Sequence, residues 1–179
     1  TCVMKTELFI SLIKEAKKLS SMYTLADILK ANCGTLDIRG VAHKGFFASI
    51  TDFPSYYDAN MNLLDYKAAQ ELFHDNWPIY TRTNDSCPTQ YFDTAEVKNS
   101  VISNGCQIEG TVENSVIGRG CVIKKGAVVK NSVVLAEVTV GEGVHVENEV
   151  VDKWARLVHE KEIVSPADQP GYIRRGDTL

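Results

Sequence analysis

The chain has 179 residues, of which 44% are hydrophobic and 23% are charged, an ordinary composition for a soluble globular protein. Its net charge of −4 argues against a general nucleic-acid binder, and no run approaches the roughly 18 apolar residues of a membrane span. The first residue is Thr1, and no apolar stretch typical of a signal peptide follows it. We therefore expect a cytoplasmic protein without membrane or nucleic-acid partners, and the chain to be a processed or truncated one.

The cysteines and histidines indicate no metal site. The five cysteines are odd in number and none forms a C-x-x-C pair, which predicts buried reduced thiols and no disulfide framework or structural zinc. They are Cys2, Cys33, Cys87, Cys106 and Cys121. His43 and His74 are not spaced as metal ligands either.

The first third of the chain mixes helical and extended patterns. Residues 6–19 place their apolar side chains on one helical stripe. Thr24 and Asp27 resemble a capping box that opens a short second helix. Residues 35–42 alternate as a strand, and residues 45–50 are a candidate for another.

A third helix and a connector follow. Asp52 is a predicted N-cap, with Pro54 in the first turn of the helix. Residues 74–95 are polar and contain two prolines, which is typical of a connector. The first 66 residues contain too few predicted helices and strands for an independent α/β domain, so we interpret them as the end of a larger domain.

The second half carries an internal repeat. Four asparagines lie 15, 17 and 17 residues apart, namely Asn99, Asn114, Asn131 and Asn148. Between them an aliphatic residue recurs every four to six positions, usually with a small or aliphatic residue two places earlier. Residues two apart share one face of a strand, so each short strand buries such a pair and then turns. Three strands close one coil of a β-helix, whereas a sandwich needs turns about every 8–12 residues.

The repeat also assigns roles to single residues. The asparagines tolerate the left-handed conformation expected at corners and would stack on one another. Cys106 and Cys121 occupy small inward positions of successive coils, as core residues. Glu149 breaks the inward pattern, which predicts that the regular coil loosens there. The tail from 165 to 179, or a partner subunit, would cap the open end.

Several stretches resemble one enzyme family. GFFASITD at 45–52 and YYDANMNLL at 56–64 resemble the G-Y-W-R-D-V-G-T and Y-W-E-A-N-M-D-L-L segments of ADP-glucose pyrophosphorylases, the glucose-1-phosphate adenylyltransferases. NWPIYT at 76–81 resembles their linker, and DKWARL at 152–157 resembles their D-K-N-A-R-I segment. The resemblance implies a mainly β chain with a left-handed parallel β-helix at 96–179, a linker at 67–95, and the C-terminal remnant of a Rossmann-like nucleotidyltransferase domain at 1–66.

One departure from the family pattern bears on catalysis. The family joins glucose 1-phosphate to ATP with Mg²⁺, and the Asp of its W-R-D motif is implied as a metal ligand. The matching residue here is Ser49, a degenerate metal position, so no catalytic residue is expected in this chain. The resemblance is then to the regulatory D-type subunit of bacterial glycogen biosynthesis. It implies a catalytic C-type partner that holds the Mg²⁺, in a hetero- or homotetramer.

The resemblance also implies an effector site. Family members respond to phosphorylated metabolites, and phosphate is bound by Lys and above all by Arg. The candidates for a sugar phosphate are Lys153, Arg156, Arg174, Arg175 and, in the linker, Arg82. Solvated surface charge is the alternative explanation for these residues.

Three other functions stay open. An unusual catalytic subunit of the same enzyme is one. A hexapeptide acyltransferase would use a coil histidine as general base, and His145 and His159 are available. A β-helix that serves only to hold an oligomer together is the third.

Overall fold

The computed structural model describes residues 2–19, 24–73, 76, 78–81, 83 and 85–179. The chain divides into two compact units, Thr1–Lys44 and Gly45–Leu179. No helix of the described part is long and apolar enough to cross a membrane.

The first unit is a pair of helices, α1 (Thr6–Leu19) and α2 (Leu25–Ala31). Its small core is formed by Leu12, Ala16 and Ile28. The predicted capping box is present, because Asp27 N donates to Thr24 Oγ1 at 3.2 Å and Thr24 N donates to Asp27 Oδ2 at 3.1 Å. Both helix predictions are confirmed.

The strands expected at 35–42 and 45–50 are wrong. The first stretch begins in a turn at 35–36, the remainder of both has no regular secondary structure, and neither pairs with a strand in the described part of the chain. Most of their large apolar side chains are exposed, as at Val41 and Phe47. Alternating hydrophobicity describes a sheet face, and it yields a strand only where a neighbouring edge accepts the backbone hydrogen bonds.

Helix α3 (Phe53–Asn62) begins as predicted. Asp52 Oδ1 accepts a hydrogen bond from Ser55 N at 2.9 Å, and a proline occupies the first turn. Helix α4 (Tyr66–Leu72), capped by Asp65, was not predicted and lies in the stretch interpreted as a linker. The assignment of 1–66 to a nucleotidyltransferase domain stays a prediction.

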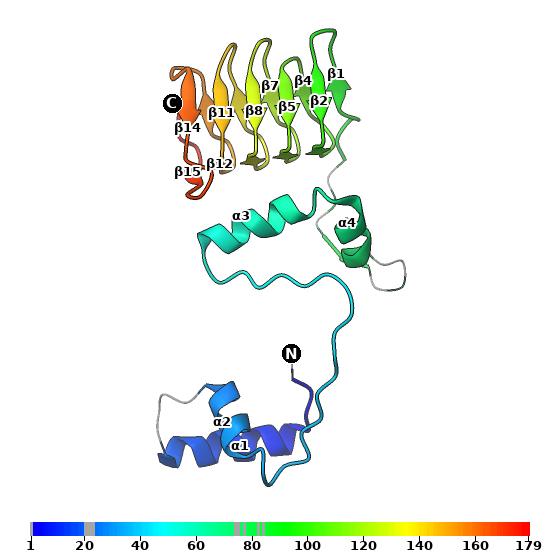
Figure 1. The fold of residues 1–179 in the computed structure, drawn as a ribbon, viewed down its shortest axis with the longest axis vertical. Coiled ribbons are helices and arrows are strands. Elements are labelled where there is room, and N and C mark those ends of the chain that lie inside the picture. The colour runs from blue at the N-terminus through cyan, green and yellow to red at the C-terminus, as the bar shows by residue number, and fades with distance from the viewer. Residues whose placement is uncertain (1, 20–23, 74–75, 77, 82, 84) are drawn as a thin grey trace. The chain divides into compact units, whose positions relative to one another are not determined.

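The second half is a parallel β-helix, as predicted (Figure 1). Its strands form three parallel five-stranded sheets, and each coil contributes one strand to each sheet. The first sheet contains β1 (Gln90–Tyr91), β4 (Gln107–Ile108), β7 (Val122–Ile123), β10 (Thr139–Val140) and β13 (Arg156–Leu157). The second contains β2 (Glu96–Lys98), β5 (Thr111–Glu113), β8 (Val128–Lys130), β11 (His145–Glu147) and β14 (Glu162–Val164). The third contains β3 (Val101–Ile102), β6 (Val116–Ile117), β9 (Val133–Val134), β12 (Glu149–Val151) and β15 (Gly171–Ile173).

The interior follows the repeat. The predicted aliphatic positions from Ile108 to Val151 are fully buried, and Ile102 of the first coil is half-buried. The four repeated asparagines all have positive φ, between 43° and 57°. Asn99 Nδ2 donates to Asn114 Oδ1 at 2.8 Å, which confirms the predicted stacking for this pair.

The coil does not loosen at Glu149, which corrects that prediction. Glu149 is only 4% exposed, and Ser165 Oγ donates to its Oε1 at 2.5 Å. Because the carboxyl is satisfied from the tail, the sheets continue regularly through β13, β14 and β15. The tail then caps the end, where Leu179 packs against the core.

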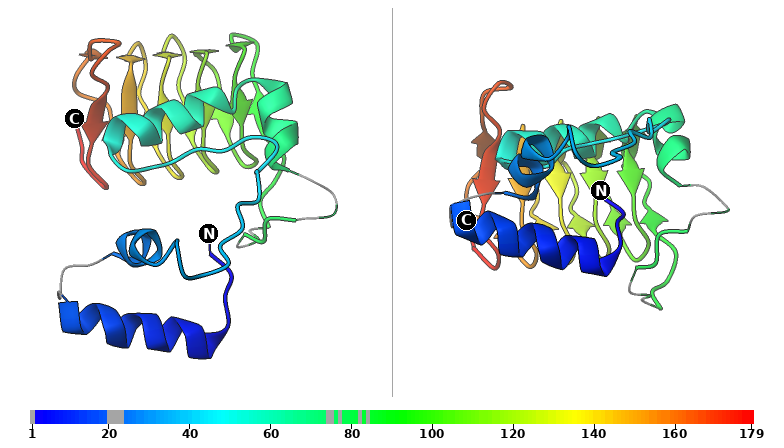
Figure 2. Two further views of the ribbon diagram at one scale, coloured as in Figure 1. Left: turned by 60° about the horizontal axis from the view of Figure 1, so that its bottom comes forward. Right: turned by 90° about the horizontal axis from the view of Figure 1, so that it is seen from below.

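Helix α3 covers the outer face of the third sheet, as both views in Figure 2 show. Tyr57 of the helix is buried with Val133 and Val150, which point outward from β9 and β12. The ring of Phe53 meets that of Tyr172 on β15 edge to face, with centroids 5.8 Å apart. The helix therefore joins the 45–72 segment to the β-helix in one unit.

Candidate functional site

The C-terminal tail brings the predicted basic residues to the last coil of the β-helix. Gly176 N donates to Lys153 O at 3.0 Å, and Arg156 N donates to Asp177 O at 2.8 Å. Arg174 and Arg175 lie between β15 and these contacts, and all four cationic side chains are exposed. We call Lys153, Arg156, Arg174 and Arg175 the basic cluster. The fifth candidate, Arg82, lies outside the described residues.

An aromatic residue that the sequence analysis missed belongs to the site. The guanidinium carbon of Arg175 lies 3.9 Å from the ring centroid of Trp154, in cation–π geometry. Trp154 stands where the family segment D-K-N-A-R-I has Asn, a departure that was visible in the sequence.

Asp152 is the acidic neighbour of the cluster. Its carboxylate accepts hydrogen bonds from Lys153 N at 2.6 Å and from the Tyr172 hydroxyl at 2.9 Å. The pKa of Asp152 is lowered, above all by the hydrogen bond from Lys153 N. The Tyr172 hydroxyl and the charges of Arg175 and Lys153 add to this effect. Asp152 is thus ionised at neutral pH, with both oxygens engaged by groups other than the cationic side chains.

The cluster has the chemistry of an oxyanion site. Within the described ranges, no carboxylate lies within ion-pair distance of its four side chains. Guanidinium groups bind phosphate oxygens in bidentate fashion, and a lysine adds a point charge. The four cations are accompanied by two acidic residues, Asp152 and Asp177, which leaves a small positive excess at this end of an acidic chain.

The degenerate metal position Ser49 is exposed in the extended segment before α3. No three Asp, Glu, His or Cys side chains gather anywhere in the described part of the chain in a way that would hold a metal ion. The described residues do not fit a Mg²⁺ site.

The two histidines predicted as candidates for acyl transfer lie on β11 and just after β13. The Nε2 atom of His145 is buried 3.2 Å from Glu147 Oε2, but makes no hydrogen bond within the described residues. His159 follows β13, and its backbone N–H donates to Leu179 O at 2.6 Å. Neither contact positions an imidazole against a nucleophile.

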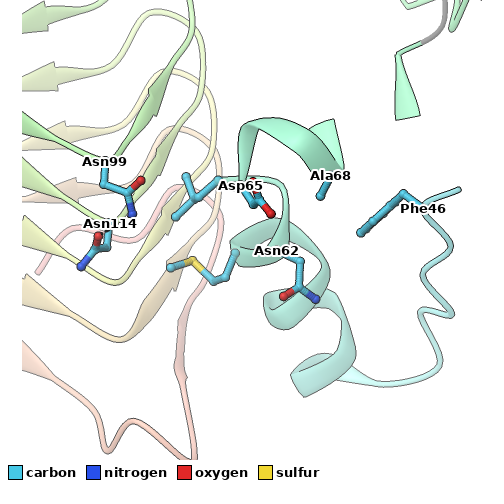
Figure 3. Close-up of a pocket in the computed structure, with 8 residues that line it drawn as sticks. Phe46, Asn62, Asp65, Ala68, Asn99 and Asn114 are labelled. Carbon is cyan, nitrogen blue, oxygen red and sulfur yellow. Dashed lines mark hydrogen bonds between the residues drawn. The ribbon is translucent and has the colours of Figure 1, made fainter. Parts of the chain in front are cut away.

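A cavity of about 610 Å³ lies between α3, α4 and the asparagine corner (Figure 3). Asn62, Asp65, Asn99 and Asn114 supply its polar lining. Asp65 caps α4 through Lys67 N at 3.0 Å, and the two corner asparagines bond to each other. Much of its polar lining is therefore already engaged in holding local structure.

The cysteines are divided between core and surface. Cys106 and Cys121 are buried, and their Sγ atoms donate to Gly118 O and Leu135 O at 3.1 and 3.0 Å. The neighbouring sulfur and burial raise the pKa of the Cys121 thiol. Burial was wrongly expected for Cys2, Cys33 and Cys87, which are exposed.

Comparison with known proteins agrees with this architecture. Residues 88–169 match the family model described as "GlmU-like, C-terminal hexapeptide". The chain is 30% identical over 153 residues to the glycogen biosynthesis protein GlgD of Bacillus subtilis, covering 86% of this chain and 45% of that protein. It is 34% identical over 141 residues to the glucose-1-phosphate adenylyltransferase of Fervidobacterium nodosum, covering 78% and 34%. GlgD of Geobacillus stearothermophilus is 35% identical over 127 residues, covering 71% and 37%.

The coils and the family model define a hexapeptide-repeat β-helix protein. Within that class, the chain is a homologue of the glucose-1-phosphate adenylyltransferases and GlgD proteins, which confirms the resemblance noted in its sequence. It spans less than half the length of these relatives.

Proposed function

We propose that this chain is the C-terminal part of a regulatory subunit of glucose-1-phosphate adenylyltransferase in glycogen biosynthesis. Similarity to two GlgD proteins over most of the chain supports the pathway. Ser49 supports the regulatory role, because a neutral hydroxyl cannot supply the charge that a carboxylate gives to Mg²⁺. The Mg²⁺ and the catalytic groups then belong to a catalytic partner subunit, in a tetramer.

The basic cluster is the effector site in this proposal, and it is the observation that carries it. The tail is anchored to the 153–156 segment by backbone hydrogen bonds, so the two segments that carry the four cations are held against each other. A sugar phosphate bound there would contact both the last coil and the tail. Its binding would be transmitted to the catalytic partner through the contacts between subunits.

The test is ADP-glucose synthesis by the full-length parent protein, alone and mixed with its catalytic partner, in the presence of Mg²⁺ and several sugar phosphates. We expect no activity alone, and a raised activity or a changed effector response in the mixture. Substantial activity of the parent alone would contradict the argument from Ser49 and favour a catalytic subunit.

A further inference from the structure

One corner of the β-helix requires left-handed backbone in every coil. Its residues are linked from coil to coil, because each backbone N–H donates to the carbonyl that precedes the equivalent residue: Gly120 to Asn104, Glu137 to Arg119, Trp154 to Ala136, and Gly176 to Lys153. All four have positive φ, from 62° to 76°, as does Gly105 in the coil before Gly120, at 80°.

Trp154 is the anomaly in this column. Glycine occupies three of the five positions and adopts positive φ without steric cost. A bulky side chain at φ 63° is a backbone outlier, and such strain persists only where its surroundings enforce it. Trp154 is also 48% exposed, so burial of its indole does not account for the choice.

The contact with Arg175 does account for it. Arg175 immediately precedes Gly176, the next residue of the column, and its guanidinium lies over the indole. A guanidinium stacked on a ring keeps its N–H donors in its own plane, directed outward from the ring edge. Stacking therefore fixes the group and leaves its donors available to an oxyanion.

The surroundings favour this use of Arg175. Asp152 interacts electrostatically with Arg175, but its oxygens are engaged by Lys153 N and the Tyr172 hydroxyl, and neither it nor Asp177 forms an ion pair with the guanidinium in the described residues. Lys153 and Arg174 flank the stacked pair in sequence and add positive charge.

We propose that Trp154 is a positioning residue, which accepts backbone strain in order to hold the Arg175 guanidinium for a phosphate group. The inference rests on the proposed anion site and adds to it the residue that orders it. A substitution that relieves the backbone strain at Trp154 by removing the indole should therefore weaken phosphate binding.

The experiment compares variants of the full-length protein in phosphate binding, measured by calorimetry with inorganic phosphate, and in thermal unfolding. Trp154→Asn suits the left-handed backbone and removes the ring. We expect its Tm to rise by about 2–4 °C and its Kd for phosphate to increase about three- to fivefold. Trp154→Phe keeps an aromatic face, so its Kd should stay within about twofold of the wild type.

Glu137→Asn is the matched control, since it relieves strain at the same corner one coil away. It should raise the Tm and leave the Kd unchanged.

The outcomes separate the two proposals. An unchanged Kd in Trp154→Asn, or an equal loss in Trp154→Phe, overturns the positioning role and leaves the anion site intact. A lower Tm in Trp154→Asn shows a structural tryptophan and also overturns it. If the wild type shows no saturable phosphate binding, the anion site itself is wrong.

Discussion

The hydroxyl of Tyr57 in α3 donates a 2.5 Å hydrogen bond to the backbone carbonyl of Asn131, 74 residues further along the chain. Asn131 is a left-handed corner residue with φ 44°, so its carbonyl is turned away from the helical and strand ladders. One bond thus ties the helix before the β-helix to the middle of the coil stack.

Tyr57→Phe tests this tie. The substitution keeps the ring against Val133 and Val150 and leaves the Asn131 carbonyl without its donor. We expect a loss of about 1 kcal/mol in the free energy of unfolding, measured by urea denaturation. Tyr56→Phe is the control, because no hydrogen bond of that hydroxyl occurs in the described residues. Equal effects of both variants would contradict the account.

Glu149 should make stability depend on pH. Burial raises the pKa of its carboxyl, and the Ser165 hydrogen bond offsets part of that rise. The folded state therefore binds the proton more tightly than the unfolded state, whose pKa is about 4.3. The resulting stability is fully present below that pH and is lost as pH rises through the folded pKa.

Glu149→Gln should accordingly stabilise the protein at pH 7 and have little effect near pH 4. The expected gain is about 1.4 kcal/mol for each unit by which the folded pKa exceeds the unfolded one. Denaturation at both pH values measures it. Glu147→Gln, on the outer face of β11, should show no such pH-dependent gain. A destabilising Glu149→Gln at pH 7 would mean that the charged form is needed.

The thiols should fall into two kinetic classes. Cys2, Cys33 and Cys87 are exposed and should react with Ellman's reagent within minutes. Cys106 and Cys121 are buried and should react only as the β-helix unfolds, because the reagent has no access to either sulfur in the folded protein. For Cys121 the raised thiol pKa also suppresses thiolate formation. Peptide mapping after a timed quench assigns the classes. Rapid labelling of Cys121 in the folded protein would refute its placement in the core.

The corner asparagines should tolerate glycine and resist alanine. Asn131→Ala places a Cβ-bearing residue without a local hydrogen-bonding side chain at φ 44°, and we expect it to cost about 1 kcal/mol in unfolding free energy. Asn131→Gly should be near neutral. Because both variants lose the same side-chain amide, a difference between their denaturation midpoints measures the cost of the left-handed backbone conformation.

The β-helix could be predicted because its coils repeat, so equivalent corner and inward positions carry similar residues several times along the sequence. Asn99 and Asn114 illustrate this, since their spacing alone indicated a stacked corner. Glu149 could not be interpreted in that way, because its partner Ser165 comes from a tail that lies outside the repeat. The strands expected at 35–42 and 45–50 failed for a related reason: alternation says nothing about whether a neighbouring edge exists.

The residues of the basic cluster could be predicted from the sequence, but not the contact between the two segments that carry them. Lys153 and Arg156 lie in a segment that resembles the family, and Arg174 and Arg175 are adjacent in the sequence. Their meeting depends on the tail pairing with the last coil, which no local pattern encodes. Trp154 was missed because a single tryptophan carries no spacing signal. Its departure from the Asn of the family segment was visible in the sequence, but the left-handed backbone that makes the position unusual was not.

The central claim, that the basic cluster passes an effector signal to a catalytic partner, is tested most directly by one titration. ADP-glucose synthesis by the complex of parent protein and catalytic partner is followed against sugar phosphate concentration, for wild type, Lys153→Ala/Arg174→Ala and the control Lys125→Ala. The account predicts that the double variant shifts the effector midpoint at least about fivefold while activity without effector is unchanged, and that Lys125→Ala behaves as wild type. An identical effector response in all three complexes would contradict it.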